Sequence, residues 1–242
     1  NTPLGSRIVE VHNGSSLFTG DAGSGESNAR RYMIENDLVE AIIALPEKMF
    51  YNTGIGTFIW VLSNRKEERR KGKIQLIDAT AIKTPLRKNM GEKNCELSPA
   101  QRQEIVRIFM AFEESEVSRI FPNSEFGYWK VSVQQPLLDE QGNPVRDKKG
   151  RIQPDKSKSD TEIIPFNYEG GIEAFMDAEV RPYAPGAFVD PKGTKIGYEL
   201  SFTKYFYKPV QLRPMEEIVA DLKALEKETD GMLAEILGGI LG

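Results

Sequence analysis

Apolar and polar positions alternate along the first ninety residues in a way that predicts strands and helices in turn. Short apolar runs occupy residues 7–11, 38–45, 57–63 and 73–79. Runs of this length and composition are typical of strands buried inside a sheet. Between the first two runs, Glu26–Asp37 places Ala29 and Met33 on one face of a predicted helix. The pattern therefore favours the α/β fold class.

A second predicted helix opens the region beyond residue 90. Ser98 and Gln101 have the spacing of a capping box, and Pro99 stands at the first helical position. The apolar residues that follow share one helical face: Ile105, Ile108, Phe109 and Phe112. This region is predicted to be an α+β extension covering residues 91–210, after a first part covering 1–90.

The rest of the extension alternates between ordered elements and a polar insertion. Trp129, Val131 and Val133 alternate as in a half-buried strand. Residues 139–160 are polar and rich in turn formers, which predicts a mobile hairpin. Its excess of lysine and arginine predicts either a solvated hairpin tip or a contact to DNA. A helix is predicted over Ile172–Val180 and a strand over Tyr198–Phe206.

Residues 211–242 are predicted to form an amphipathic helix that begins at Pro214. Its apolar positions follow the alternating four-and-three spacing of a coiled-coil seam: Ile218, Leu222, Leu225, Met232 and Ile236, with Thr229 in the same register. Two interpretations stay open. The seam packs within the chain, or it docks against a helix of another subunit.

Composition excludes several classes of protein. With 242 residues and 39% hydrophobic residues, the chain can bury a core, and no run has the length of a membrane span. A signal-peptide pattern is absent, so we expect a cytoplasmic protein without membrane contact. One cysteine, Cys95, and one histidine, His12, cannot form a cysteine/histidine metal site, so no metal is expected.

The chain is acidic overall but contains one strongly basic stretch in its first ninety residues. The net charge of −4 argues against a protein that coats nucleic acid along its whole surface. Residues 65–73, RKEERRKGK, nevertheless concentrate basic side chains. They predict either a solvated turn or a contact to nucleic-acid phosphate.

A glycine-rich stretch, NGSSLFTGDAGSGESNARRYMIEND at residues 13–37, raises the possibility of a nucleotide site. Asn28 stands where a dinucleotide fingerprint needs a small residue, and Glu26 follows Gly25 where a phosphate loop needs Lys. Asp21, Gly23 and Gly25 are a weaker match to the Asp-x-x-Gly-x-Gly turn of S-adenosylmethionine-dependent methyltransferases. The alternative is a surface loop whose Ser24 or Ser27 caps the following helix.

Residues 13–66 resemble a region of the modification (methyltransferase) subunits of type I restriction-modification systems, which methylate adenine at N6 in DNA. Four later segments resemble the C-terminal part of the same subunits, in the same order: DTEIIPF, EVRPYAPGAFVD, KIGYELSFTKYFY and LKALEKETDGMLAEIL. The resemblance thus covers almost the whole chain. It implies the C-terminal part of a Rossmann-like class I methyltransferase sheet, with residues 57–63 running antiparallel to their neighbours.

The family's catalytic Asn-Pro-Pro-Phe/Tyr motif has no counterpart here, because none of the fourteen prolines has a proline neighbour. The resemblance therefore implies the C-terminal portion of a longer subunit, with no catalytic residue of its own and no cofactor expected for this portion alone. S-adenosylmethionine would serve the full-length enzyme. The family usually has an apolar strand where Glu10 and His12 stand, and His12 is not expected to be catalytic.

The loop EKMFYNTGIG corresponds to an element near the family's target-base pocket. Enzymes that act on a base hold it, flipped out of the stack, between apolar or aromatic surfaces. Phe50 or Tyr51 is predicted to make such a contact, with Asn52, Thr53 and Gly54 shaping the loop. The alternative is that Phe50 caps the sheet and Tyr51 is a surface aromatic.

Three functional hypotheses follow. The first is part of an adenine-specific DNA methyltransferase that works with a specificity subunit, a second methyltransferase subunit and a restriction subunit. The second is an assembly module that binds the specificity subunit without catalysis. The third, an unrelated nucleotide-binding α/β protein, depends on the glycine-rich stretch alone.

Overall fold

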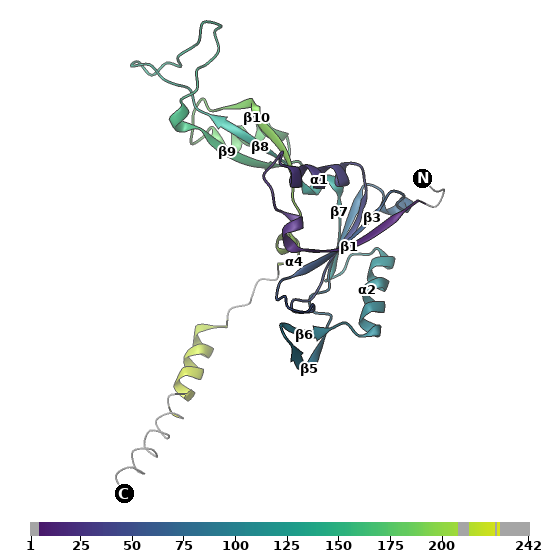
Figure 1. Cartoon of the computed structure of the whole chain (residues 1–242). Coiled ribbons are helices and arrows are strands. Elements are labelled where there is room, and N and C mark those ends of the chain that lie inside the picture. The colour runs from purple at the N-terminus through teal and green to yellow at the C-terminus, as the bar shows by residue number, and fades with distance from the viewer. Residues whose placement is uncertain (1–4, 208–212, 226, 228–242) are drawn as a thin grey trace. The chain divides into compact units, whose positions relative to one another are not determined.

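The computed structural model describes residues 5–207, 213–225 and 227. Its centre is a five-stranded sheet with strand order β1-β3-β2-β4-β7 (Figure 1). The strands are β1 (Arg7–Asn13), β2 (Val39–Ala44), β3 (Thr57–Ser63), β4 (Lys73–Asp78) and β7 (Ser118–Pro122). The strands predicted near the start of the chain are thus present, and the predicted α/β class is confirmed.

Strand directions in this sheet are mixed. β3 is antiparallel to both β1 and β2, as the resemblance implied, while β2 and β4 are parallel. β1, β2 and β4 therefore point the same way, and their carboxyl ends lie along one edge. β7 closes the other side of the sheet, antiparallel to β4.

Two helices cover opposite faces of the sheet, α1 (Gly25–Glu35) and α2 (Pro99–Ala111). Successive residues of β2 point to opposite faces, as the pleat requires. Ile42 packs in one apolar cluster with Ile34 of α1, whereas Ile43 packs in another with Ile105 of α2. All six residues of β2 are buried, which explains why the strand is apolar at every position except Glu40.

Both helices begin at a cap that the sequence indicates. The Ser24 hydroxyl accepts a hydrogen bond from the Ser27 backbone N–H, which decides between the two predicted caps of α1. At α2, the Gln101 backbone N–H donates to the Ser98 hydroxyl, and the Ser98 N–H donates to the Gln101 side chain. The predicted capping box is therefore confirmed.

The basic stretch 65–73 stabilises the far end of α2. The last carbonyls of a helix lack partners inside it. Arg69 donates to the carbonyls of Met110 and Ala111 at 2.7 and 3.0 Å, and Arg70 donates to that of Phe109. The stretch is thus more than a solvated turn, because two of its arginines cap this helix.

A three-stranded antiparallel sheet of order β10-β8-β9 forms the second layer of structure. It consists of β8 (Gly127–Gln134), β9 (Asp160–Pro165) and β10 (Phe188–Tyr198), and it packs on α3 (Gly171–Phe175) and the π-helical turn Met176–Val180. Arg30 of α1 donates to the Tyr198 carbonyl at 2.8 Å, which ties the two layers together. Residues 135–159, which we call the arm, stand out from this sheet between β8 and β9 (Figure 1).

The strand predicted over Tyr198–Phe206 is wrong, because β10 ends at Tyr198 and Phe202–Phe206 form the short helix α4. Phe202, Tyr205 and Phe206 have the three-and-four spacing of a helix face. Their rings pack on the central sheet, with centroids 5.0 Å apart for Phe202 and Phe58 and 4.2 Å apart for Tyr205 and Phe121. Aromatic contacts across the fold therefore decide the conformation here.

The hairpin of β5 (Thr84–Met90) and β6 (Lys93–Glu96) was not predicted. Near the C-terminus, residues 215–225 are helical, as expected for part of the last segment. The chain divides into two compact units, Asn1–Phe206 and Tyr207–Gly242. Within the described ranges, no helix combines the length and apolar character that crossing a bilayer requires.

Candidate functional site at the carboxyl edge of the sheet

The carboxyl ends of β1 and β2 bring two loops together. Residues 14–24 follow β1, and residues 45–56 join β2 to β3. Asn13 at the end of β1 lies directly opposite Thr57 at the start of β3, so both loops leave the sheet at the same edge. Ligands of open α/β sheets bind outside this edge, which makes it the candidate site.

Hydrogen bonds hold loop 45–56 at its base and near its beginning. The Leu45 N–H donates to the Thr57 carbonyl at 2.9 Å and closes the base of the loop. From β6, the Asn94 N–H donates to the Lys48 carbonyl at 3.0 Å, and the Cys95 thiol donates to the Glu47 carbonyl at 3.3 Å. The β5–β6 hairpin therefore braces the loop from outside the sheet.

The middle of this loop presents its apolar side chains to solvent. Phe50 is 37% exposed, Tyr51 61% and Ile55 55%. Exposed aromatic side chains on a braced loop are suited to recognise a planar group. Tyr51 and Phe50 are thus accessible, as the predicted base contact requires.

Phe50 also lines an apolar groove of about 580 Å³ that lies between α2 and the face of β1 and β3. Arg7 and Arg102 are the charged residues in its wall. Its other lining residues are apolar: Val9, Val11, Ile43, Leu45, Met49, Phe50, Ile59, Val61, Leu97, Ile105, Val106, Phe109 and Met110. Tyr51 does not line this groove, so the structure separates the surroundings of the two aromatic residues.

The three predicted loop-shaping residues differ in how the backbone constrains them. Asn52 has φ +56°, a left-handed conformation that asparagine adopts more readily than most residues. The Thr53 hydroxyl accepts a weak hydrogen bond from the Ile55 N–H at 3.4 Å. A Cβ on Gly54 would meet only ordinary contacts, the nearest at 3.7 Å to Glu92, so Gly54 is not required sterically.

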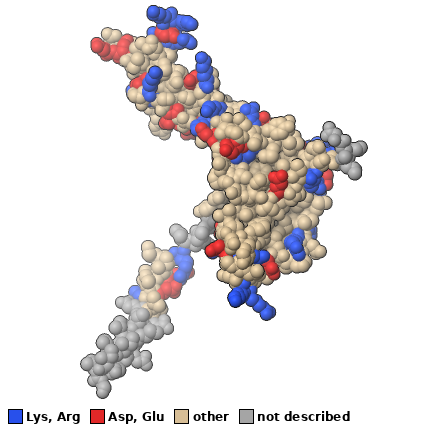
Figure 2. All heavy atoms as spheres, viewed as in Figure 1, with Lys and Arg blue, Asp and Glu red and all other residues tan. Residues whose placement is uncertain are grey.

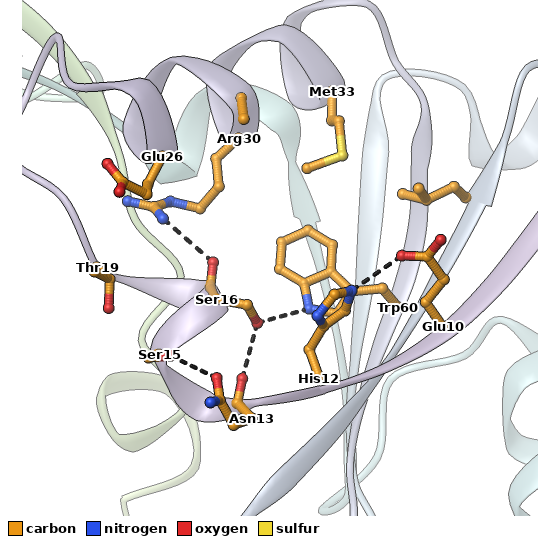
Figure 3. A pocket seen from close by; sticks show the side chains of 12 residues that line it. Glu10, His12, Asn13, Ser15, Ser16, Thr19, Glu26, Arg30, Met33 and Trp60 are labelled. Carbon is orange, nitrogen blue, oxygen red and sulfur yellow. Dashed lines mark hydrogen bonds and ion pairs between the residues drawn. The ribbon is translucent and has the colours of Figure 1, made fainter.

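A second hollow, of about 410 Å³, lies on the opposite face of β1 and against α1 (Figure 3). Because β1 side chains alternate, Val9 and Val11 line the apolar groove while Glu10 and His12 line this hollow. His12 Nε2 lies 3.0 Å from Glu10 Oε2, so these two polar residues partner each other. His12 and Phe50 are therefore not brought together.

The polar contacts deeper in this hollow were not predicted from the sequence. The Trp60 indole N–H donates to the Ser16 hydroxyl at 3.1 Å, and the Arg30 guanidinium donates to the Ser16 carbonyl at 3.2 Å (Figure 3). A tryptophan in an apolar strand signals the need for one hydrogen-bond acceptor. Nothing in the local pattern identifies that acceptor as Ser16.

The glycine-rich stretch forms a turn that packs toward the three-stranded sheet. Gly20 and Gly23 have φ of +91° and +80°, whereas Gly25 begins α1 without a positive φ. Lys130 Nζ lies 2.6 Å from Asp21 Oδ1, and this hydrogen bond lowers the pKa of the Asp21 carboxyl. Asp21 lies eight residues beyond the end of β1, and its carboxylate already has a cationic partner.

Comparison with known proteins identifies the family. Residues 5–131 match the family model described as N-6 DNA Methylase. The chain belongs to this family. The predicted resemblance to type I modification subunits is confirmed by sequence relatives, three of which are methylase subunits of Methanocaldococcus jannaschii.

The type I restriction enzyme MjaVII methylase subunit is 47% identical over 58 residues, 24% of this chain and 10% of that protein. The MjaIX methylase subunit is 33% identical over 112 residues, 46% of this chain and 19% of that protein. The chain thus spans between a tenth and a fifth of the curated relatives that it matches. A solved type I methyltransferase subunit from Streptococcus thermophilus is 21% identical, with 49% of this chain and 23% of that chain covered and a TM-score of 0.42.

The predicted docking residues lie apart from this site in the sequence. Ile218, Leu222 and Leu225 lie in the helix at 215–225 and are 40%, 59% and 58% exposed. Met232 and Ile236 lie outside the described residues. The described part of the predicted seam is therefore a line of accessible apolar side chains.

Proposed function

We propose that this chain supplies one wall of the target-base pocket in a type I modification methyltransferase. In the full subunit, a methyl group passes from S-adenosylmethionine to N6 of an adenine in DNA. The observation that carries the proposal is Phe50, an exposed aromatic at the carboxyl edge of the sheet and on the rim of an apolar groove. An adenine taken out of the duplex needs such a surface.

The residues of this chain are proposed to bind and orient the base. Phe50 or Tyr51 stacks on its face, and the braced loop holds the ring in place. The glycine-rich stretch fits S-adenosylmethionine poorly, because Asp21 is engaged by Lys130 and lies eight residues beyond the end of β1. We place the donor-binding residues and the Asn-Pro-Pro-Phe/Tyr motif elsewhere in a longer subunit.

Replacing the stacking residue tests this proposal in the assembled enzyme. The variants Phe50→Ala and Tyr51→Ala are compared with Tyr32→Ala, which removes a 64% exposed aromatic from α1. Loss of base stacking costs roughly 1–3 kcal/mol, so we expect kcat/KM for DNA methylation to fall about five- to 150-fold for one loop variant. Tyr32→Ala should stay within about twofold.

Fluorescence identifies which aromatic holds the base. A duplex that carries 2-aminopurine in place of the target adenine should become brighter when the stacking ring is removed, because stacking quenches this base. Phe50→Trp or Tyr51→Trp should restore both quenching and rate at the residue that stacks. Two alanine variants with unchanged rate and unchanged fluorescence would refute the role of the loop.

A second role is favoured by the helix at 215–225. We propose that its exposed apolar line docks on helices of the specificity subunit, in a complex that also contains a second methyltransferase subunit and a restriction subunit. Charges placed in the seam, Ile218→Asp with Leu222→Asp, should abolish co-elution with the specificity subunit in gel filtration. Lys223→Gln on the same helix is the matched control and should co-elute normally.

A further inference from the structure

The arm contains two turns that have the same hydrogen-bond pattern. Asp139, Asp147 and Asp155 recur at intervals of eight residues. The Asp139 carboxylate accepts from the N–H groups of Gln141 and Asn143 at 3.0 and 2.8 Å. The Asp147 carboxylate accepts in the same way from Lys149 and Arg151 at 2.8 and 3.0 Å.

Backbone bonds close both turns identically. The Asp139 N–H donates to the Asn143 carbonyl at 2.9 Å, and the Asp147 N–H donates to the Arg151 carbonyl at 2.8 Å. Gly142 and Gly150 supply the positive φ at the matching position, +83° and +78°. The arm therefore presents two preformed loops of the same shape, which we call the acidic turn (Asp139–Asn143) and the basic turn (Asp147–Arg151).

The side chains at the corresponding tips are opposite in character. The acidic turn presents Glu140 and Gln141, whereas the basic turn presents Lys148 and Lys149. Figure 2 shows Lys and Arg gathered at the outer end of the arm, with a separate group of Asp and Glu beside them. Between Arg146 and Lys158 the sequence has six basic and two acidic residues, in a chain whose net charge is −4.

The carboxylates of this segment do not neutralise the lysines at its tip. Asp147 is occupied by backbone N–H groups and by Arg151, whose guanidinium lies 2.8 Å away, and these bonds lower the pKa of the Asp147 carboxyl. Asp155 faces Lys158 at 3.8 Å. Lys148 and Lys149 are exposed, and their ammonium groups have no partner among the described residues.

We propose that the basic turn is a second DNA contact, which binds backbone phosphates of the duplex away from the methylated base. This inference rests on the proposed function, since it takes DNA as the substrate. Duplex DNA carries about one negative charge per 1.7 Å. Two adjacent lysines on a preformed turn can pair with phosphates at little conformational cost.

Salt dependence of DNA binding by the assembled enzyme tests the contact. The variant Lys148→Gln with Lys149→Gln removes both charges from solvent-exposed positions. Each lost phosphate contact reduces the slope of log Kd against log salt by about 0.9, so we expect a slope lower by about 2. Affinity at low salt should fall at least fivefold, with kcat at saturating DNA unchanged.

The acidic turn provides the matched control. Glu140→Gln with Gln141→Ala alters the corresponding two positions of a turn that has the same shape. These substitutions should leave the slope of log Kd against log salt unchanged. Reversal of charge, Lys148→Glu with Lys149→Glu, should weaken binding further than the neutral variant.

Three results would overturn the proposal. The neutral variant could bind DNA with the wild-type salt slope. It could instead lose association with another subunit while DNA affinity stays intact, which would make the basic turn a protein contact. A wild-type enzyme that binds no DNA would refute the proposed function itself, before any arm variant is made.

Discussion

Two basic stretches of this chain have similar compositions and different roles. Residues 65–73 lie beside the C-terminal end of α2, where Arg69 and Arg70 donate to helix carbonyls and Arg70 is buried. Residues 146–158 lie in the arm, where Lys148 and Lys149 are exposed. The two stretches differ in the number of hydrogen-bond acceptors that lie close to their basic side chains.

The inner stretch meets a helix end, where unpaired carbonyls and the negative end of the helix dipole attract cations. Arg70 is 1% exposed and has its guanidinium 4.3 Å from the ring centres of both Phe109 and Phe112. Its Nη1 also donates to Gln75 Oε1 at 3.1 Å, and Glu40 lies 3.5 Å from its Nε. The arm has turns in place of a helix end, so Lys148 and Lys149 keep their hydration and stay available to a partner.

The largest difference in stability between the two basic stretches is expected at Arg70. Arg70→Met leaves Glu40, itself 1% exposed, with Arg7 as its remaining cationic partner. We expect the free energy of unfolding to fall by about 3–5 kcal/mol, as for other broken buried pairs, measured by denaturant titration of the subunit. Adding Glu40→Gln should recover part of the loss. A decrease below about 1 kcal/mol would show that the network stabilises little.

Low pH should weaken the contacts that Asp37 makes with residues 65–73, namely those to Lys66 and to the Gly72 N–H. Burial raises the pKa of its carboxyl, but hydrogen bonds from Lys66, Gly72 and Asn123 outweigh burial and leave the pKa below 3.8. The resulting stabilisation is complete above the unfolded pKa and is lost as pH falls through the lower folded pKa. Asp37→Asn should lower the free energy of unfolding by roughly 1–3 kcal/mol at pH 7, through the weakened hydrogen bonds to the carboxylate. Asparagine tolerates the φ of +56° at this position, so backbone strain should not add to this loss.

The pH profile of unfolding checks this assignment. The difference between wild type and Asp37→Asn should shrink as pH falls below 3.8, because the Asp37 carboxyl is then protonated first in the unfolded chain and, at lower pH, in the folded protein as well. A difference that stays constant from pH 7 down to pH 3 would mean that the carboxylate charge is not the cause.

The smallest effects compare the two stretches directly. Arg69→Gln removes two hydrogen bonds from the end of α2 and should lower the free energy of unfolding by about 1 kcal/mol. Lys148→Gln with Lys149→Gln should change it by less than about 0.5 kcal/mol, as is usual for exposed positions. Equal losses in thermal unfolding would contradict the distinction between a capping arginine and a solvated lysine.

Elements governed by local interactions could be predicted from the sequence. The capping box of Ser98 and Gln101 joins residues three apart, and the apolar run at 38–45 is long and hydrophobic enough to demand a buried strand. The family resemblance likewise depends on contiguous residues, and the family model matches residues 5–131. Phe50 was predicted as a base contact on this resemblance and stays a prediction, although its place on the groove was not foreseen.

Only the tertiary structure decided the features that join distant residues. Phe202–Phe206 became a helix because their rings reach Phe58 and Phe121 across the fold. Arg70 became a buried capping residue because the end of α2, 39 residues later, lies beside it. Local hydrogen bonds and periodicity act within a few residues and can be read from the sequence, whereas burial and charge pairing depend on which distant surfaces meet.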